Sequence, residues 1–412
     1  KEFMEEIPTD QFLGDKETLD ASSTTRRDFL KYLGFTTAAA TLASCEGPVR
    51  TAIPYVIKPQ DITPGIPNYY ATTFFDGFDF ANILVKTREG RPIKIEPNKE
   101  ANGSTNARVQ ASVLSLYDNN RLQNPKFKGK DTTWDKVDAD IPNKIKAIIA
   151  SGKEVVLLKG TCASPSGNRL VEQFQTKVGA LRTVVYDAVS ESAALDAFEA
   201  LYGVRELPDY DFSKAKTIVS IGADFLGDWQ GGGFEKSYVQ GRRPEAGNMS
   251  YHAQLESNMS LTGANADKRF PLKPSEQIFA LINLYNAITG GSLASKATPI
   301  DADLKKLAAQ LKAAGSQGVV VTGIQDKNSQ ILALAINEAL GSVVIDKTYT
   351  KKVRQGNDAA VQTLLADMKA GKIGGIIIYN ANPVYTLPNA KAFADQLGKL
   401  ELSVTFASLE NE

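Results

Sequence analysis

The sequence predicts an α/β protein with two doubly wound parallel-sheet units, preceded by a small β-hairpin region and an extended N-terminal arm. From residue 134 onward, runs that are apolar at nearly every position alternate with amphipathic helical segments. Strands of a parallel sheet are covered by helices on both faces, so they carry such continuous apolar runs. The chain has 412 residues, with 32 Gly and 18 Pro, which suits a loop-rich α/β protein.

Residues 134–412 therefore form the expected α/β region, which we expect to be incomplete at its C-terminal end. Helices are expected where apolar residues recur with a helical period, at 134–150, 165–179, 192–203, 275–290 and 300–315. Strands are expected at the continuous apolar runs 154–160, 182–187, 215–224, 318–323, 341–346 and 374–380.

A hairpin and an arm are expected before this region. Within 81–133, two runs of alternating apolar residues at 81–98 flank the turn Arg88–Arg91, a pattern typical of a β-hairpin. Residues 46–80 are rich in proline and aromatic residues, and we expect an extended arm that contacts partners. Its aromatic residues are expected in the core or in a subunit interface; they are Tyr69, Tyr70, Phe74, Phe75, Phe78 and Phe80.

Composition excludes several classes of function. Lys and Arg together number 47, as do Asp and Glu, so the formal net charge is zero. Nucleic acid is therefore not an expected partner, because binding it needs an excess of basic residues. No run reaches the roughly 18 apolar residues of a membrane-spanning helix.

Metal ligands are scarce in this sequence. Cys45, Cys162 and His252 are its only cysteines and histidine. Zinc sites and iron–sulfur clusters are usually built from several such ligands. We expect no metal, no cofactor and no catalytic residue in this segment. Cys162 is expected to be a buried thiol, and His252 an ordinary hydrogen-bonded residue.

Residues 24–45 have the pattern of a twin-arginine export signal, after an acidic segment at 1–23. A small-residue apolar stretch and then Leu42–Cys45, shaped like a lipobox, follow the arginines. Alternatively, the segment forms an amphipathic helix with its arginines in solvent. We expect the signal to be retained, with Cys45 either lipidated or a buried thiol. The signal residues are Arg26, Arg27, Phe29, Leu30 and Lys31.

Three glycine- or asparagine-rich loops follow expected strands, at 160–168, 221–233 and 380–388. Such loops can present backbone amides to phosphates. None of them has a GxGxxG or GxxxxGK[ST] pattern, and loops after parallel strands are often glycine-rich. Asp224 and Asp228, in the second loop, do not form the close pair that carboxylate catalysis needs.

The order of segments resembles the front part of molybdopterin-dependent oxidoreductases. The resemblance is carried by GRPIKIEPN (90–98), LYDNNRLQNP (116–125), AKTIVSIGAD (215–224), DKRFPLKPSEQIFALINLY (267–285) and GGIIIYNANPVYTLP (374–388). In that family a cysteine cluster motif precedes the hairpin, and a Ser, Cys or selenocysteine further on binds molybdenum. Here 68–80 contains no cysteine, and no residue can be matched to the molybdenum ligand. The resemblance thus implies the family's fold without its cofactor chemistry.

The N-terminal part also resembles the large iron–sulfur subunit of bacterial alternative complex III. The matching segments are EFMEEIP (2–8), TTRRDFLKYLG (24–34), LASC (42–45) and PYVIKPQDITPGIPNYYATTF (54–74). This resemblance implies a cofactor-free front domain, followed in the longer polypeptide by a part with iron–sulfur clusters. It implies quinol oxidation linked to cytochrome c or a similar acceptor, on the periplasmic face of the inner membrane. The implied partners are multihaem and monohaem cytochrome c subunits and integral-membrane quinol-binding subunits.

The expected function is therefore that of a structural and assembly domain in a membrane-bound quinol-oxidising respiratory complex. Two alternatives stay open. The first is an active molybdopterin-dependent oxidoreductase domain that binds its pterin through the three loops. The second is a stand-alone exported lipoprotein that binds a small ligand.

Overall fold

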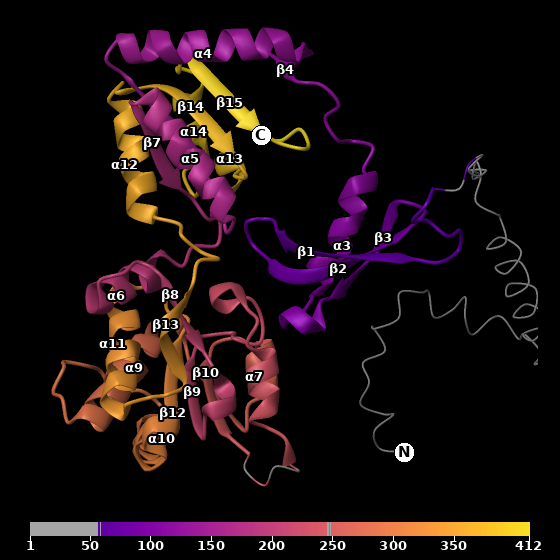
Figure 1. Ribbon diagram of the computed structural model, residues 1–412. Helices are drawn as coiled ribbons and strands as arrows, with labels where there is room; N and C mark the ends of the chain where they lie inside the picture. The colour runs from indigo at the N-terminus through magenta and orange to yellow at the C-terminus, as the bar shows by residue number, and fades with distance from the viewer. Residues whose placement is uncertain (1–56, 58, 245–246, 248) are drawn as a thin grey trace, which may run out of the picture. The chain divides into compact units, whose positions relative to one another are not determined.

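The computed structural model describes residues 57, 59–244, 247 and 249–412 (Figure 1). Residues Pro64–Glu412 form one compact unit, and all the helices and strands described below belong to it. No helix among the described residues combines the length and the apolar character of a membrane span. The residues expected in the export signal and its lipobox lie outside the described residues; they are Arg26, Arg27, Phe29, Leu30, Lys31 and Cys45.

A three-stranded antiparallel sheet comes first, in the order β1-β2-β3. Its strands are β1 (Asn68–Phe75), β2 (Phe80–Arg88) and β3 (Arg91–Pro97). The hairpin expected at 81–98 is present, and its tight turn has left-handed backbone at Glu89 (φ 52°) and Gly90 (φ 79°). Helix α3 (Ala107–Ala111), the 3₁₀ turn η4 (Ser112–Tyr117) and their apolar side chains cover one face of the sheet.

The structure adds strand β1 to the segment expected to be an arm. Residues 68–75 are rich in Tyr, Phe and Thr, the residue types that favour strands, and they pair with β2 along their whole length. The aromatic residues of this segment consequently point to different faces. Phe74 packs in the small core against α3, whereas Tyr69 and Phe80 are exposed.

The first parallel sheet has the order β15-β14-β6-β7. It consists of β6 (Glu154–Lys159), β7 (Leu181–Val185), β14 (Ile373–Tyr379) and β15 (Leu402–Phe406). Alternate residues of β6 enter two cores, because side chains of a strand point alternately to its two faces. Helices α4 (Trp134–Ala150) and α5 (Pro165–Val178) pack on one face. The other face packs against α12 (Asp358–Lys369) and α14 (Ala390–Leu397), near the short α13 (Pro383–Thr386).

The second parallel sheet has the order β11-β10-β9-β12. Its strands are β9 (Thr217–Ile221), β10 (Tyr251–Glu256), β11 (Lys268–Pro271) and β12 (Gly318–Thr322). Helices α9 (Pro274–Thr289) and α10 (Asp301–Ala314) cover one face. An aromatic core with α6 (Ser192–Tyr202) and α7 (Glu235–Gln240) covers the other, and α11 (Lys327–Leu340) contributes to both cores. The short helix α8 (Leu261–Ala264) follows β10.

The strand expected at 341–346 differs from the expectation. Strand β13 runs from Ile345 to Lys351 and pairs antiparallel with β8 (Leu207–Tyr210), outside the parallel sheet. Val344, just before it, is fully buried in the aromatic core, which explains the apolar run in the sequence. Two segments connect the two parallel sheets: 186–191, after β7, and 352–357, before α12.

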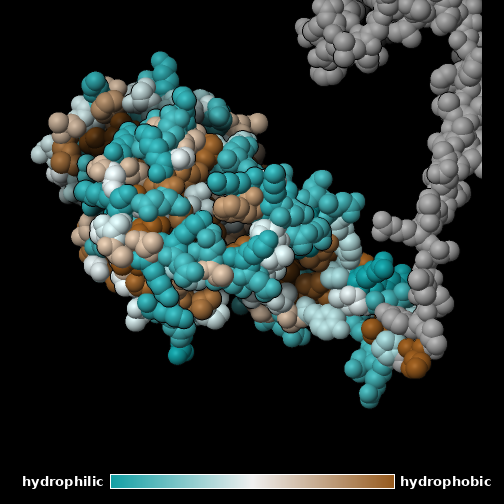
Figure 2. Space-filling view, turned by 90° about the horizontal axis from the view of Figure 1, so that it is seen from above, coloured by the Kyte–Doolittle hydropathy of each residue, from teal (hydrophilic) through white to brown (hydrophobic). Residues whose placement is uncertain are grey.

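Hydrophilic side chains cover most of the face shown in Figure 2, and hydrophobic ones are exposed between them in small patches.

Candidate functional site at the strand ends

The three loops singled out in the sequence lie at the carboxyl ends of the parallel strands, in two groups. Loops 160–168 and 380–388 follow the neighbouring strands β6 and β14. They touch so closely that a Cβ on Gly160 would lie 2.6 Å from the carbonyl oxygen of Asn380. Loop 221–233 follows β9 and meets the end of β12, where a Cβ on Gly323 would lie 2.1 Å from the carbonyl oxygen of Gly222.

The turn Asp76–Asp79, between β1 and β2, contacts the loop after β14 directly and is linked to the loop after β9 through Arg108. Asn380 donates a hydrogen bond from Nδ2 to the carbonyl of Asp76 (3.0 Å). Asp79 accepts two bonds from Arg108, at 2.7 Å from Nε and 2.8 Å from Nη2. Arg108 Nη2 also lies 2.5 Å from Oδ1 of Asp228, in the loop after β9. Arg108 lowers the pKa of Asp79, and the two carboxylates raise the pKa of Arg108.

Phe78, within this turn, lies against two guanidinium groups. The guanidinium carbon of Arg108 is 5.0 Å from its ring centroid, and that of Arg354 is 4.5 Å away. Arg354 is only 2% exposed and donates from Nη1 to the carbonyl of Val353 (2.9 Å). Burial lowers the pKa of Arg354, while Asp187 and Glu191 oppose this effect. A buried cation thus joins the turn to the segment that connects the two parallel sheets.

Asp187 ties the first connecting segment to the second. Its carboxylate accepts hydrogen bonds from Thr161 N (2.9 Å) and Thr161 Oγ1 (2.7 Å), at the end of β6. It also accepts from the backbone N–H groups of Gln355 (3.1 Å) and Gly356 (2.9 Å). Arg205 reinforces this connection by donating to the carbonyl of Gly356 (2.8 Å). Four donors on one carboxylate hold these backbone segments in one arrangement.

Glu191 is a second buried carboxylate, 4% exposed. It accepts from the backbone N–H of Gln230 (3.1 Å) and from Nε2 of Gln325 (3.3 Å), and burial raises its pKa. Gln230 has a left-handed backbone (φ 48°), and three further left-handed residues, Gly231 to Gly233, follow it. Two buried side-chain atoms here, Oε1 of Gln230 and Nε2 of Gln355, have no hydrogen-bond partner among the described residues. We call the turn Asp76–Asp79 together with Arg108, Thr161, Asp187, Glu191, Asp228, Gln230, Arg354 and Gln355 the strand-end junction.

The other residues weighed in the sequence lie elsewhere or serve the fold. Cys162 is partly exposed rather than buried, and its thiol lies 3.8 Å from the carbonyl of Ser164, within its own loop. Asp224 accepts from N and Oγ1 of Thr262 and so anchors the loop after β9 to α8. Among the described residues, no three Cys, His, Asp or Glu side chains are grouped so that they could hold a metal ion.

His252 is fully buried on β10, in a row of hydrogen-bonded side chains. Its Nδ1 lies 3.0 Å from the hydroxyl of Tyr238, and its Nε2 lies 3.2 Å from Oε1 of Gln254. Gln254 donates to Glu256 (3.1 Å), which is paired with Arg269 (2.6 Å). Burial lowers the pKa of His252 to about 4. This is the hydrogen-bonded histidine that the sequence predicts.

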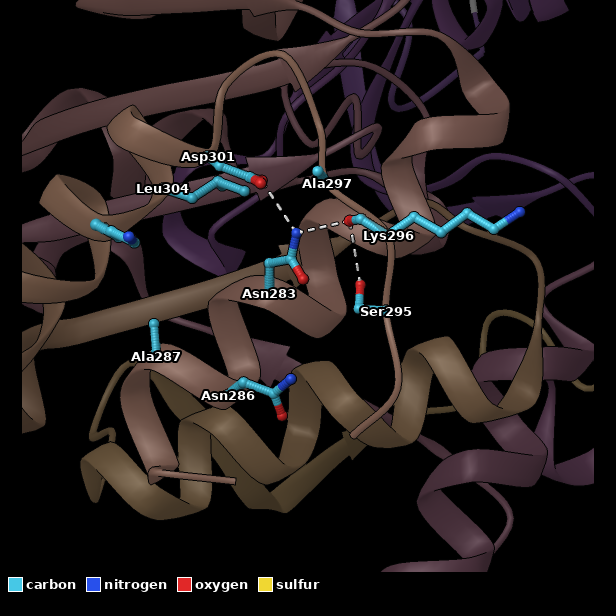
Figure 3. Close-up of a pocket in the computed structure, with 9 residues that line it drawn as sticks. Asn283, Asn286, Ala287, Ser295, Lys296, Ala297, Asp301 and Leu304 are labelled. Atoms are coloured by element: carbon cyan, nitrogen blue, oxygen red, sulfur yellow. Dashed lines mark hydrogen bonds between the residues drawn. The ribbon is translucent and has the colours of Figure 1, made fainter. Parts of the chain in front are cut away.

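A surface cavity of about 470 Å³ lies between α9, α10 and the loop at 295–297 (Figure 3). Its two asparagine side chains, Asn283 and Asn286, already form hydrogen bonds with the surrounding residues. Asn283 donates from Nδ2 to the carbonyl of Lys296 and to Asp301, at 3.0 Å each. Asn283 therefore fastens the loop to both helices, and the cavity offers a ligand few free partners. No sequence pattern indicates this cavity.

The junction residues Arg354, Asp187 and Glu191 were not predicted from the sequence, because none of them belongs to a recognisable motif. The relevant signal is weak: isolated charged residues beside expected apolar strands, such as Asp187 directly after β7. Charges at strand ends are common, so only their burial in the structure separates them from ordinary loop residues.

One curated relative and two of the similar solved structures are compared with the chain below. No protein-family model matches the chain. The chain is 26% identical, over an alignment of 446 residues, to the menaquinone reductase, molybdopterin-binding-like subunit of Nitratidesulfovibrio vulgaris strain Hildenborough. The alignment covers 94% of this chain and 63% of the relative, so the chain spans less than two thirds of the relative's length.

The structure is similar to acetylene hydratase from Pelobacter acetylenicus, with a TM-score of 0.57 and 12% identity, over 82% of this chain and 58% of that one. A second match is the formyltransferase/hydrolase complex from Methylorubrum extorquens, with a TM-score of 0.43 and 15% identity. It covers 66% of this chain and 80% of that one. The similarity to acetylene hydratase confirms the expected fold class, an α/β architecture with parallel sheets.

Proposed function

We propose that this chain is the structural and assembly part of a subunit in a membrane-bound quinone oxidoreductase complex, and that this part carries no molybdopterin and no metal cluster. The relative named as a menaquinone reductase subunit supports a place in such a complex. The single observation that carries the structural role is the packing of Phe78 against both Arg108 and Arg354 at the strand-end junction.

The junction residues do not fit the pterin cofactor that members of the molybdopterin-dependent family bind. A pterin dinucleotide carries phosphates, which bind to uncommitted backbone N–H groups or cationic side chains. Arg108 is held from two sides by Asp79 and Asp228, and Arg354 is buried against a ring. The buried carboxylates Asp187 and Glu191 would repel an anion. Cys162, the one thiol among the described residues, contacts its own loop.

The finer assignment follows the resemblance of the N-terminal part to the large subunit of alternative complex III. In this proposal the chain is exported by the twin-arginine route to the periplasmic face of the inner membrane. There it contacts haem-bearing cytochrome c subunits and integral-membrane quinol-binding subunits. Electrons pass through iron–sulfur clusters in a further part of the polypeptide. The greater length of the menaquinone reductase subunit supports such a further part.

Metal and pterin analysis of the purified complex tests the proposal. We expect no molybdenum above background and no pterin released on denaturation, in a preparation that oxidises quinol. One molybdenum and at least one pterin for each copy of this chain would contradict it. Co-purification with membrane and haem-bearing subunits tests the proposed place in a membrane-bound complex. A chain that purifies alone from solubilised membranes would contradict that place.

One observation favours a second candidate, a domain that binds a polar ligand at the junction. The unpartnered Oε1 of Gln230 and Nε2 of Gln355 could both be satisfied by such a ligand. Mass spectrometry of the small molecules released on denaturation separates the candidates: a stoichiometric polar ligand, a pterin among the possibilities, supports the second, and its absence supports the first.

A further inference from the structure

We propose that the outer edge of strand β1 receives an extended segment of a partner subunit as an additional strand, and that this segment carries carboxylates at one end and apolar side chains at the other. The inference deepens the proposed function and rests on it, since it requires a partner in the same complex. It assigns the chemistry of one contact that holds the complex together.

Strand β1 lies at the edge of its sheet. It pairs with β2 on one side, and no described strand pairs with its other side. Its central residues, Tyr69 to Thr73, are all exposed, on both faces of the strand. Every second backbone N–H and C=O of such an edge points outward, in the geometry that accepts another strand.

The sequence of β1 does not protect this edge. Natural edge strands usually carry charged side chains, proline or a bulge, which prevent pairing with another chain. The eight residues NYYATTFF contain no charge, no proline and no glycine, and the pairing with β2 has no bulge. An uncharged strand of Tyr, Thr and Phe that lacks these features is suited to strand addition.

The uncovered face beside this edge indicates what the partner carries. Helix α3 covers the face of Ala81 and Ile83, so the residues that alternate with them lie on the uncovered face. There Phe75 lies opposite Phe80, with ring centroids 6.4 Å apart, and Tyr69 lies opposite Lys86. One end of the face is therefore apolar and the other is basic.

The basic end has a charge that the described residues do not neutralise. The ammonium of Lys86 lies 5.6 Å from the ring centroid of Tyr69, and no described carboxylate is within ion-pair distance of it. Lys94, across from Lys86 on β3, pairs with Glu96 at 3.3 Å. A partner strand with a carboxylate near Tyr69 and apolar side chains near Phe75 complements both ends.

Hydrogen–deuterium exchange of the full chain, alone and within the purified complex, tests the inference. We expect the outward-facing amides, every second one among residues 70–75, to exchange at least about tenfold more slowly in the complex, because an added strand protects them. The amides of β2, already paired on both sides, serve as the internal control and should not change. Equal exchange of β1 in the two samples overturns the inference.

A photo-crosslinking residue at Tyr70 identifies the occupant. The expected product joins β1 to an extended segment of another subunit that contains Asp or Glu. Crosslinks to a second copy of this chain, to its own residues, or to a segment without carboxylates overturn the inference.

A matched pair of variants measures the contribution to assembly. Thr72→Lys places a charge on the exposed edge, and Leu170→Lys places one on the exposed surface of α5. We expect Thr72→Lys to reduce partner retention about tenfold and Leu170→Lys to leave it unchanged. Equal retention in both variants, or an equal loss, overturns the inference. A complex that forms while β1 stays unprotected refutes only this inference, whereas a chain without any partner refutes the proposed function.

Discussion

The guanidinium carbon of Arg354 lies 4.5 Å from the ring centroid of Phe78, so a buried cation between β13 and α12 rests on an aromatic ring from the turn between β1 and β2. The two residues are far apart in sequence. Their contact joins the antiparallel sheet to the segment that links the two parallel sheets.

Replacing Phe78 by alanine should destabilise the chain by about 2 kcal/mol. The variant loses a half-buried ring and its contacts with two guanidinium groups. Urea unfolding followed by circular dichroism measures the change. Leu170→Ala, on the exposed surface of α5, is the control and should cost less than about 0.5 kcal/mol. Equal stability of the two variants would show that the turn is not a structural contact.

Replacing Asp187 by asparagine should cost about 2 to 3 kcal/mol. The carboxylate accepts four hydrogen bonds, and the amide group of Asn would place a donor against backbone N–H groups. Thermal unfolding of the variant measures this loss. Asp395→Asn, at an exposed position on α14, is the matched control and should leave the melting temperature unchanged.

Acidification from pH 6.5 to pH 4 should weaken the fold through His252. The pKa of the folded residue is about 4, well below its ordinary value of 6.5, so only the unfolded chain takes up this proton in that range. Stability is therefore full above about pH 6.5 and falls by roughly 3 kcal/mol towards pH 4. Glu191 acts in the opposite sense, because its raised pKa lets the folded chain bind a proton first.

The contribution of His252 is the difference between the wild-type chain and His252→Gln, measured by urea unfolding at several pH values. The charged and titratable groups around the imidazole are Tyr238, Arg242, Glu256 and Asp267. His252 is the single histidine of the chain, so its titration can also be followed directly by NMR. A titration midpoint near 6.5 in the folded chain would refute the prediction.

Replacing Gly323 by alanine should destabilise the second parallel sheet by about 3 kcal/mol or more. The new Cβ would lie 2.1 Å from the carbonyl oxygen of Gly222, on the neighbouring strand end, and backbone atoms cannot move aside cheaply. Gly398→Ala is the matched control, because its Cβ meets nothing closer than 3.9 Å. Chemical unfolding of both variants should show a large loss for the first and no loss for the second.

Sequence patterns predicted the elements whose signal is local. The strands β6, β9, β12 and β14 carry continuous apolar runs, and each lies where the sequence placed it. Strand β10 was missed, although it lies next to β9 in the same sheet. Its sequence YHAQLE alternates polar with apolar residues, and its polar residues are buried because each has a bonding partner. His252 bonds to Tyr238 and to Gln254, and Glu256 pairs with Arg269.

The candidate site was less predictable than the fold. The aromatic residues at 69–80 were visible in the sequence, but their separate roles depend on strand alternation and, for Phe78, on the turn between β1 and β2. Phe74 faces the small core, Phe78 lies against two guanidinium groups, and Tyr69 faces the uncovered side. The partners that define those roles, such as Arg354, come from remote segments, and no local pattern encodes such contacts.

The first parallel sheet combines strands from two distant stretches of the chain, since β6 and β7 precede the whole second sheet, and β14 and β15 follow it. On the ribosome, the inner stretch can reach its final shape early, whereas β6 must wait for β14, which ends at Tyr379, to emerge. Until then β6 and β7 can pair only with each other, and the edge of β6 that receives β14 stays open. We therefore expect the open edge of β6 to stay unpaired longer than any strand edge inside the inserted sheet.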